Sequence, residues 1–188
     1  MKNYQTSEIK NVVLLGAPGS GKTTFAEAMA FEGKVIDRRG SIENENTLSD
    51  NTDLEHSNRR SIYSTILYTE FMNHKLNIID APGSDDFSGG LFAAFKVADV
   101  GLMLFNAQNG FEVGSEIQSR YAKTYNVPLV GVINQLDSEK ANWEGTLESI
   151  ASFSKVKPIV VQYPVNPGPG FDAFIDVPVS YTHLTLPT

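Results

Sequence analysis

The chain has 188 residues, 41% of them hydrophobic and 20% charged, so it can bury the core of about one domain and is too apolar for global disorder. Its net charge of -7, with no basic stripe, excludes a surface that coats nucleic acid, and we expect no DNA partner. It lacks cysteine, a signal-type N-terminus and any apolar run near 18 residues, which predicts a cytoplasmic protein that does not enter the membrane. We also expect a monomer.

The first predicted strand, 11–15, leads through a glycine-rich stretch into a helix predicted over 22–31, which ends before Gly33. The stretch comprises Gly16, Ala17, Pro18, Gly19, Ser20, Gly21, Lys22, Thr23 and Thr24. Its glycines let the backbone curl so that N–H groups point at an anion, and the helix adds the positive end of its dipole. In such a loop Lys22 reaches the outer phosphates, where we expect a catalytic role, and the Thr23 hydroxyl holds Mg²⁺. The alternative is a glycine-rich turn with an exposed lysine, which the flanking strand and helix disfavour.

Residues 38–60 are rich in Asn, Asp, Glu and Ser and are predicted to form a long mobile loop. Loops of this length inside compact domains are usually functional. The β-branched and aromatic residues of 65–71 then predict a strand. Asn73 and His74 can turn the chain back into a strand at 76–80, which gives an antiparallel hairpin.

A second motif follows the strand at 76–80, and it comprises Asp80, Ala81, Pro82 and Gly83. At the end of a strand the Asp80 carboxylate can reach Mg²⁺ through water, and the Gly83 amide can lie beside a γ-phosphate. An Asp-x-Pro-Gly turn is a common loop, so this functional interpretation depends on the phosphate loop upstream.

Helices are predicted next at 90–97, 115–125 and 142–153, and strands at 100–106, 129–134 and 158–162. Apolar strands that alternate with helices predict a mostly parallel sheet covered by helices on both faces. The fold class is therefore α/β, a three-layer P-loop NTPase fold with one antiparallel hairpin strand. Functional groups are expected at the carboxyl ends of its strands.

A third motif follows the strand at 129–134, and it comprises Asn134, Gln135, Leu136 and Asp137. Asp137 can accept the ring N–H and the exocyclic amine of guanine, while the Asn134 amide contacts the other edge of the purine. Adenine has an acceptor where guanine has that N–H, so adenine would leave the carboxylate unpaired. The alternative is an incidental turn capped by two polar side chains.

Together these motifs resemble the N-terminal GTP-binding domain of elongation factor G, a translational GTPase, or of a paralogue. The matching segments are 16–24, 80–87, 106–110, 134–137, Pro164 and 171–177, so the resemblance covers about residues 8–177. It implies GTP or GDP with Mg²⁺ as ligands, hydrolysis of GTP, and a GTPase-type fold that is incomplete at its C-terminus. It also implies a ribosome partner, reached through domains missing from this chain. We expect 1–177 to be this partial GTP-binding domain.

Several positions depart from the family pattern. Ser84 stands where the family has the histidine that positions the attacking water, so Gly83 and Ser84 are the candidate catalytic residues beside Lys22. Gly19 replaces an aspartate of the phosphate loop, and Gln135 replaces a lysine. These departures leave GTP binding predicted and make fast hydrolysis doubtful.

The threonine with which the family closes its loop on Mg²⁺ also has no match, because Tyr63 occupies that position. Ser61, Ser64 and Thr65 are the candidates to replace it, and the sequence does not choose among them. Catalysis by the chain is expected to come mainly from positioning and electrostatic stabilisation.

The segment 178–188 is predicted to be a non-native tail, because 180–188 resembles the translation of a sequencing adapter joined to a truncated reading frame. A natural polar tail is the alternative.

For the whole chain the prediction is a Mg²⁺-dependent GTPase that acts on the ribosome. Two alternatives stay open: a GTP-binding switch with little hydrolysis, and a P-loop ATPase or kinase in which 134–137 is an incidental turn.

Overall fold

The computed structural model describes residues 3–58, 60–84, 88–155 and 157–178, and the chain falls into two compact units. Unit 1 comprises Met1–Leu104 and Glu112–Val132, and unit 2 comprises Phe105–Phe111 and Ile133–Thr188. Residues 85–87, the end of the segment 80–87 that resembles the family, and 179–188 of the expected tail lie outside the described residues.

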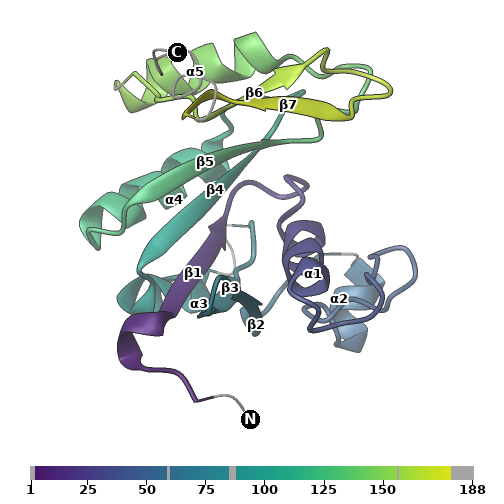
Figure 1. Ribbon diagram of the computed structural model, residues 1–188, viewed down its shortest axis with the longest axis vertical. Coiled ribbons are helices and arrows are strands. Elements are labelled where there is room, and N and C mark those ends of the chain that lie inside the picture. The colour runs from purple at the N-terminus through teal and green to yellow at the C-terminus, as the bar shows by residue number, and fades with distance from the viewer. Residues whose placement is uncertain (1–2, 59, 85–87, 156, 179–188) are drawn as a thin grey trace, which may run out of the picture. The chain divides into compact units, whose positions relative to one another are not determined.

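A five-stranded sheet has the order β2-β3-β1-β4-β5 (Figure 1). The strands are β1 (Ile9–Leu15), β2 (Thr65–Phe71), β3 (His74–Asp80), β4 (Val100–Asn106) and β5 (Leu129–Asn134). Strand β1 pairs in parallel with β3 and with β4, while β2 pairs antiparallel with β3. The predicted mostly parallel sheet with one antiparallel hairpin strand is therefore confirmed.

The hairpin turn lies one residue earlier than predicted. Met72 and Asn73 have φ angles of 45° and 63°, and His74 already belongs to β3. Positive φ at both central residues gives a turn whose twist matches the right-handed twist of the two strands. The His74 Nδ1 atom also lies 2.9 Å from the Met72 carbonyl oxygen, which ties the start of β3 to the turn.

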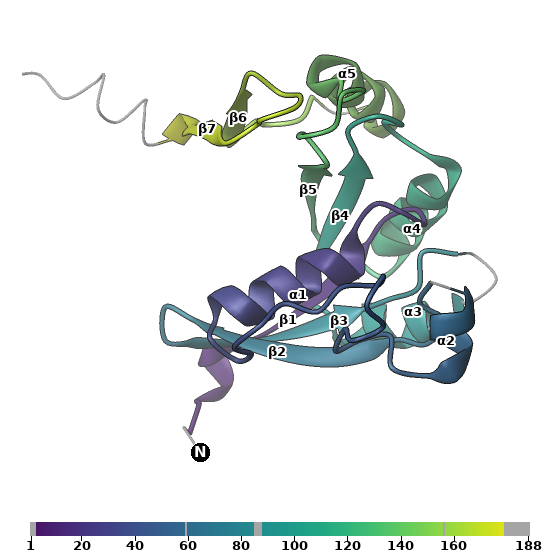
Figure 2. The ribbon, with the colours of Figure 1, turned by 90° about the vertical axis from the view of Figure 1, so that its right-hand side faces the viewer.

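Helices lie on both faces of the sheet, as predicted. They are α1 (Lys22–Glu32), which ends before Gly33, α3 (Ser88–Val97) and α4 (Val113–Thr124). Helix α1 packs on β1, β2 and β3 on one face of the sheet. Helices α3 and α4 lie on the opposite face, where α3 packs on β1 (Figure 1). At the far end of α1, the Thr69 hydroxyl of β2 donates to the Met29 carbonyl at 2.9 Å (Figure 2 shows α1 lying along this part of the sheet).

The core of unit 1 lies between these layers. Val13, Leu14 and Leu15 of β1, Ile78 of β3 and Leu104 of β4 are almost completely buried. Because both faces of the central strands are covered, their runs are continuously apolar rather than alternating. The buried strands hold the loops at their carboxyl ends in fixed positions.

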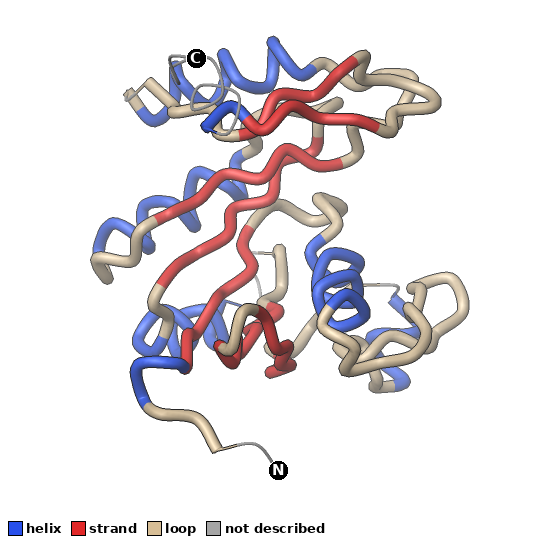
Figure 3. Tube along the Cα trace, in the orientation of Figure 1, coloured by secondary structure: helices blue, strands red, loops and turns tan. Residues whose placement is uncertain are grey.

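The segment predicted as a long mobile loop contains a short helix, α2 (Asp53–Asn58), drawn in blue between tan loops in Figure 3. Thr52 and Glu55 form a capping box: the Glu55 N–H donates to Thr52 Oγ1 and the Thr52 N–H donates to Glu55 Oε2, each at 3.3 Å. The prediction of an irregular loop is wrong for these residues. The Thr-x-x-Glu spacing was the sequence signal for a helix here.

Unit 2 contains α5 (Trp143–Ser154), β6 (Gln162–Val165) and β7 (Ala173–Asp176). Strands β6 and β7 pair antiparallel in a separate two-stranded sheet. The strand predicted at 158–162 is wrong, since β6 begins only at Gln162 and does not join the main sheet. Pro158 has no N–H to donate to a ladder, and Ile159 is 90% exposed, so this apolar run forms no buried strand.

Candidate functional site

The predicted phosphate loop connects β1 to α1. Gly16, Gly19 and Gly21 have φ angles of 134°, 79° and 90°, a region that other residues rarely adopt. At Gly16 a Cβ atom would also collide with the Leu104 carbonyl oxygen. The Gly16 N–H donates to Gln118 Oε1 of α4 at 2.6 Å, which fixes the start of the loop. Pro18, Gly19 and Thr24 are exposed, whereas Ala17 and Ser20 are buried.

Lys22 is folded back onto this loop. Its ammonium group donates to the Gly16 carbonyl at 2.9 Å and to the Ala17 carbonyl at 3.1 Å, and the residue is only 6% exposed. Burial lowers the pKa of Lys22 to about 8, although the nearby carboxylates of Asp80 and Asp50 act in the opposite direction. At pH 7 the loop therefore contains a buried positive charge next to its own carbonyl groups.

Thr23 and Asp80, the residues predicted to hold Mg²⁺, lie in contact. The Thr23 hydroxyl donates to Asp80 Oδ2 at 2.9 Å, and Asp80 is 1% exposed. Burial raises the pKa of Asp80 to about 6, against the lowering effect of the hydrogen bond from Thr23. The ends of β3 and of the phosphate loop thus place a carboxylate and a hydroxyl side by side.

The rest of the second motif continues from Asp80 past the phosphate loop. Ala81 and Pro82 are buried, and a Cβ atom on Gly83 would lie 2.5 Å from Lys22 Nζ and 2.9 Å from the Pro18 nitrogen. Only glycine lets the backbone approach the lysine this closely. Ser84 follows and is half-buried.

The third motif belongs to unit 2, where main-chain hydrogen bonds hold it. The Asn134 carbonyl accepts from the Ala107 N–H at 2.9 Å, and the Leu136 carbonyl accepts from the Gly168 N–H at 2.7 Å. The Gln135 side chain accepts from Asn106 Nδ2 at 2.7 Å. Asn134 is half-buried and Asp137 is exposed, so the motif forms a fixed turn that presents a carboxylate to solvent.

Comparison with known proteins agrees with this geometry. The sequence matches the family described as "Elongation factor Tu GTP binding domain" over residues 7–179. The chain belongs to this family. A crystal structure of a protein from Thermus thermophilus has the same fold, with a TM-score of 0.84 and 31% identity, over 91% of this chain and 26% of that one. The fold is thus that of a P-loop GTP-binding domain.

Curated relatives of this GTP-binding domain are named as translation factors. Elongation factor G from Salinibacter ruber is 30% identical over 176 residues, which are 94% of this chain and 25% of that protein. Elongation factor G from Dehalococcoides mccartyi is 32% identical over 164 residues, 87% of this chain and 24% of that protein. The mitochondrial ribosome-releasing factor 2 from Danio rerio is 27% identical over 175 residues, which are 93% of this chain and 23% of that protein. The chain spans about a quarter of the length of these relatives.

Two further residues of the GTP-binding domain act on this cluster from the segment 38–64, which extends the predicted loop to the start of β2 and of which the structure describes all but residue 59. Ser61 Oγ lies 3.1 Å from Thr23 Oγ1, so of the three candidates for the missing threonine it is the one in contact with Thr23. Asp50 is 5% exposed, and its charge acts on the pKa of both Lys22 and Asp80. No pattern in the sequence pointed to Asp50, because an acidic residue in a polar loop looks like a solvated one.

The buried oxygens of this cluster fit a divalent cation. Within the described residues, both carboxylate oxygens of Asp50 and Oδ1 of Asp80 are buried and accept no hydrogen bond of good geometry, although the Ser61 and Ser49 hydroxyls lie near enough to Asp50 and Asp80, respectively, to lower their pKa values. Such orphaned buried acceptors are costly unless an ion or water meets them, and carboxylate and hydroxyl oxygens are what Mg²⁺ prefers. Among the same residues no three His, Asp or Glu side chains can hold a metal together, so further ligands would have to come from phosphate and water.

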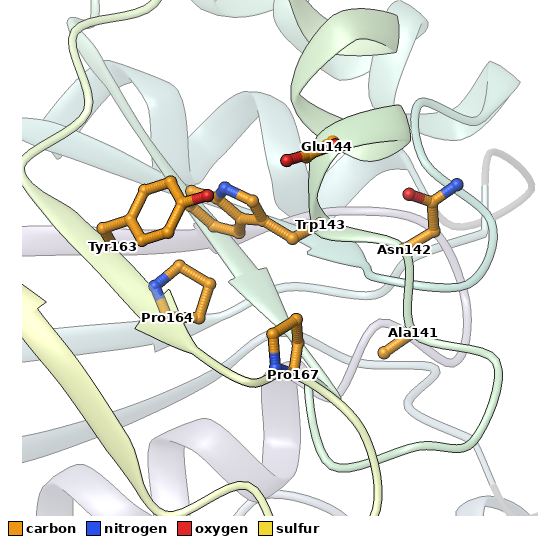
Figure 4. A pocket seen from close by; sticks show the side chains of 7 residues that line it. All are labelled: Ala141, Asn142, Trp143, Glu144, Tyr163, Pro164 and Pro167. Carbon is orange, nitrogen blue, oxygen red and sulfur yellow. The ribbon is translucent and has the colours of Figure 1, made fainter.

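A separate cavity of about 200 Å³ lies in unit 2 and contains none of the predicted site residues. Trp143 and Tyr163 meet nearly edge to face in its wall, with ring centroids 5.9 Å apart (Figure 4). Its lining residues are Ala141, Asn142, Trp143, Glu144, Tyr163, Pro164 and Pro167. In the part of the chain that is described, no helix is both long enough and apolar enough to cross a membrane.

Proposed function

We propose that this domain binds GTP and GDP with Mg²⁺ and hydrolyses GTP as part of a protein related to elongation factor G. The observation that carries the proposal is the buried polar cluster of unit 1. In it the Thr23 hydroxyl donates to Asp80, the Lys22 charge acts on the pKa of Asp80, and the Gly83 backbone lies close to the lysine. The family match to a GTP-binding domain supports guanine over adenine nucleotides.

Each motif has a role in this proposal. The residues of 16–24 cradle the phosphates with their N–H groups, and the Lys22 ammonium neutralises phosphate charge. Thr23 and Asp80, together with Asp50, hold Mg²⁺, which when bound neutralises charge on the β- and γ-phosphates. Asn134 and Asp137 select guanine, and Gln135 and Leu136 form the backbone of that turn.

In the hydrolytic step a water attacks the γ-phosphorus, the bond to the bridging oxygen breaks, and GDP and inorganic phosphate leave. The Gly83 N–H donates to the γ-phosphate, and the Lys22 ammonium stabilises the charge on the leaving oxygen. The Ser84 hydroxyl orients the water but has no imidazole to hold it in a second direction. We therefore propose slow intrinsic turnover.

A second candidate function is a GTP-dependent switch with little hydrolysis, and Ser84 is the observation that favours it. In either case we propose the ribosome as the partner and the cytoplasm as the location. The family and the names of the relatives support the ribosome as partner, since two relatives are elongation factors and one is a ribosome-releasing factor. Because the chain matches about a quarter of those proteins, we assign the ribosome contacts to parts outside the matched segment.

The test is a competitive titration of fluorescent GDP on the 188-residue chain by GTP, ATP and xanthosine triphosphate, with and without Mg²⁺. We expect displacement by GTP, strengthened by Mg²⁺, and none by ATP at matched concentrations. Equal displacement by ATP would contradict the proposal and favour a P-loop ATPase or kinase. Phosphate release with and without ribosomes then separates the enzyme from the switch.

A further inference from the structure

The side chain of Asn106, the last residue of β4, joins two loops of unit 2. Its Oδ1 accepts from the Gln108 N–H at 2.8 Å, and its Nδ2 donates to Gln135 Oε1 at 2.7 Å. Gln108 lies in the loop after β4, whereas Gln135 lies in the third motif after β5. The segment 106–110 resembles the family, yet the proposed nucleotide site gives it no role. The Asn106 side chain connects this segment to that site.

The direction of the Gln135 amide follows from these two hydrogen bonds. A main-chain N–H can only donate, so the Gln108 N–H fixes the oxygen end of the Asn106 amide. The NH₂ end of Asn106 therefore faces Gln135, and because an NH₂ only donates, it must meet the oxygen of the Gln135 amide. The Gln135 NH₂ consequently turns away from Asn106. One main-chain group thus decides which end of the glutamine amide faces away from the loop after β4.

The main chain at both residues is held as well. The Asn106 carbonyl accepts from the N–H groups of Asn109 at 3.1 Å and Gly110 at 2.9 Å. The Gln135 carbonyl accepts from the Ser138 N–H at 3.3 Å, and Gln135 has a φ of 61°, which residues with a side chain rarely adopt. Such a conformation persists only where the surroundings determine it, and it is frequent at ligand sites. The two amides are therefore held at a fixed separation.

We propose that Asn106 is a positioning residue that turns Gln135 into a hydrogen-bond donor for a bound guanine nucleotide. With its oxygen bonded to Asn106, Gln135 presents its NH₂ rather than its oxygen to an acceptor atom of the nucleoside. Gln135 replaces a lysine of the family pattern, and an ammonium group likewise only donates. The amide keeps a donor at that position without the charge. This role rests on the proposed function, since it adds a side chain of the third motif to the same nucleotide site.

The first test follows the side-chain NH₂ of Asn106 by nuclear magnetic resonance on the full chain without nucleotide. We expect its hydrogen-bonded proton to exchange with water about tenfold more slowly than an NH₂ proton of the exposed Asn51. Gln135→Met removes the acceptor and should abolish this protection, whereas Gln162→Met, the same change at an exposed residue, should not. Equal exchange rates at Asn106 and Asn51 in the wild type overturn the proposal, whether or not the chain binds a nucleotide.

The second test compares the affinities for GDP and GTP by titration with fluorescent analogues. Asn106→Asp keeps an oxygen that accepts from Gln108 but loses the donor, so the Gln135 amide turns its NH₂ to the carboxylate and its oxygen away from it. We expect both nucleotides to bind about tenfold more weakly. Asn109→Asp, which adds the same charge at an exposed position of the same loop, should change either affinity by less than about twofold.

A double-mutant cycle separates positioning from other effects of the new charge. In the Gln135→Met background, Asn106→Asp should change the affinity for GDP by less than about twofold, because no amide is left to orient. Asn106→Asp combined with Gln135→Lys should bind within about threefold of the wild type, because the carboxylate holds the ammonium and a donor is restored. A loss that persists in the Gln135→Met background overturns the proposal. So does a lysine double variant that stays as weak as Asn106→Asp alone.

A further variant keeps the cycle usable if Gln135→Met does not fold by circular dichroism. Gln135→Gly then replaces it, because glycine suits the positive φ at this position and also lacks the amide. Absence of any GDP binding by the wild type, with the Asn106 proton protected, contradicts the proposed function. Binding of GDP by the wild type without coupling in the cycle contradicts only the role of Asn106.

Discussion

The buried cluster of Lys22, Thr23 and Asp80 in unit 1 and the third motif, 134–137, in unit 2 are built in opposite ways. Lys22, Thr23 and Asp80 are no more than 6% exposed and are linked to one another or to their own loop by hydrogen bonds. Asp137, in contrast, is an exposed side chain on a turn that main-chain bonds hold. Buried charged groups need partners, so a change in one alters its neighbours, whereas an exposed group acts by itself. Substitutions in the buried cluster should therefore affect its members together, whereas substitutions in the third motif should act independently of one another.

The largest effect is expected from Lys22→Met, which removes the buried ammonium. We predict that GTP and GDP both bind about 100-fold more weakly or worse, a loss of about 2.7 kcal/mol, because a charged hydrogen bond to phosphate disappears. Burial already disfavours this charge, so the melting temperature without nucleotide should not fall. Isothermal titration calorimetry and thermal melts measure both, with the exposed Lys10→Met as control. If Lys22→Met kept its affinity for GTP and GDP, Lys22 would not be part of the nucleotide site.

A change in the third motif should alter specificity rather than overall affinity. For Asp137→Asn we predict about 30-fold weaker binding of GTP, because the asparagine NH₂ cannot accept a hydrogen bond from guanine. We predict tighter binding of xanthosine triphosphate, because xanthine has a carbonyl oxygen in place of the exocyclic amine of guanine, and the NH₂ can donate to it. Glu139→Gln, an exposed carboxylate two residues away, should leave the preference unchanged. The measurement is competition against fluorescent GDP. If Asp137→Asn instead weakened all nucleotides equally, the contrast between the buried cluster and the third motif would be lost.

A smaller effect is expected from Gly83→Ala. Its methyl group would lie 2.5 Å from Lys22 Nζ, so the lysine must move away from the loop. We predict about tenfold weaker binding of GTP and a smaller change for GDP, since Gly83 is assigned to the γ-phosphate. Gly89→Ala is the control, because nothing lies within 4 Å of a Cβ atom at that position. Equal losses for GTP and GDP would assign Gly83 to loop shape only.

The smallest expected effect is a change in the number of protons that are released when Mg²⁺ and GDP bind. Because the pKa of Asp80 is raised to about 6, about half of its carboxyl groups are protonated at pH 6 and few at pH 8. Cation binding requires the ionised form, so Asp80 should contribute about half a proton more to the protons released on binding of Mg²⁺ and GDP at pH 6 than at pH 8. Calorimetry in two buffers of different ionisation enthalpy measures this, and Asp80→Asn should remove that contribution while leaving the one from Lys22, whose pKa is about 8. A wild type that releases no extra proton at pH 6 contradicts the assignment.

Much of the fold could be predicted from the sequence because its signals are local. The strands at 65–71, 100–106 and 129–134 have the predicted bounds, since their apolar β-branched and aromatic residues suit the pleated surface of a sheet. The phosphate loop was equally predictable, because its glycines are needed for the backbone shape itself. The strand expected at 158–162 failed since an apolar run alone does not show whether a partner strand lies beside it.

The polar part of the candidate site was predictable only where a residue has a fixed spacing from the loop. Thr23 belongs to the phosphate loop and Asp80 ends a strand, so a contact between them could be expected. The burial of Asp50 and Glu27 depends on how the 38–64 segment folds back on α1, a tertiary arrangement that leaves no pattern in the sequence. Glu55 was the intermediate case, because its capping box with Thr52 is a local signal.

The hydrogen bond from the Thr69 hydroxyl to the Met29 carbonyl makes α1 a rigid connection between the phosphate loop and β2. An eleven-residue helix is about 16 Å long, and here one end carries Thr23, which we propose holds Mg²⁺, while the other is hydrogen-bonded to β2. A uniform helix transmits a tilt at one end to the other, so β2 receives any displacement of the phosphate loop. A spin label or fluorophore on the exposed Phe71, at the end of β2, would then report events at the phosphate site from a distance at which it cannot disturb them.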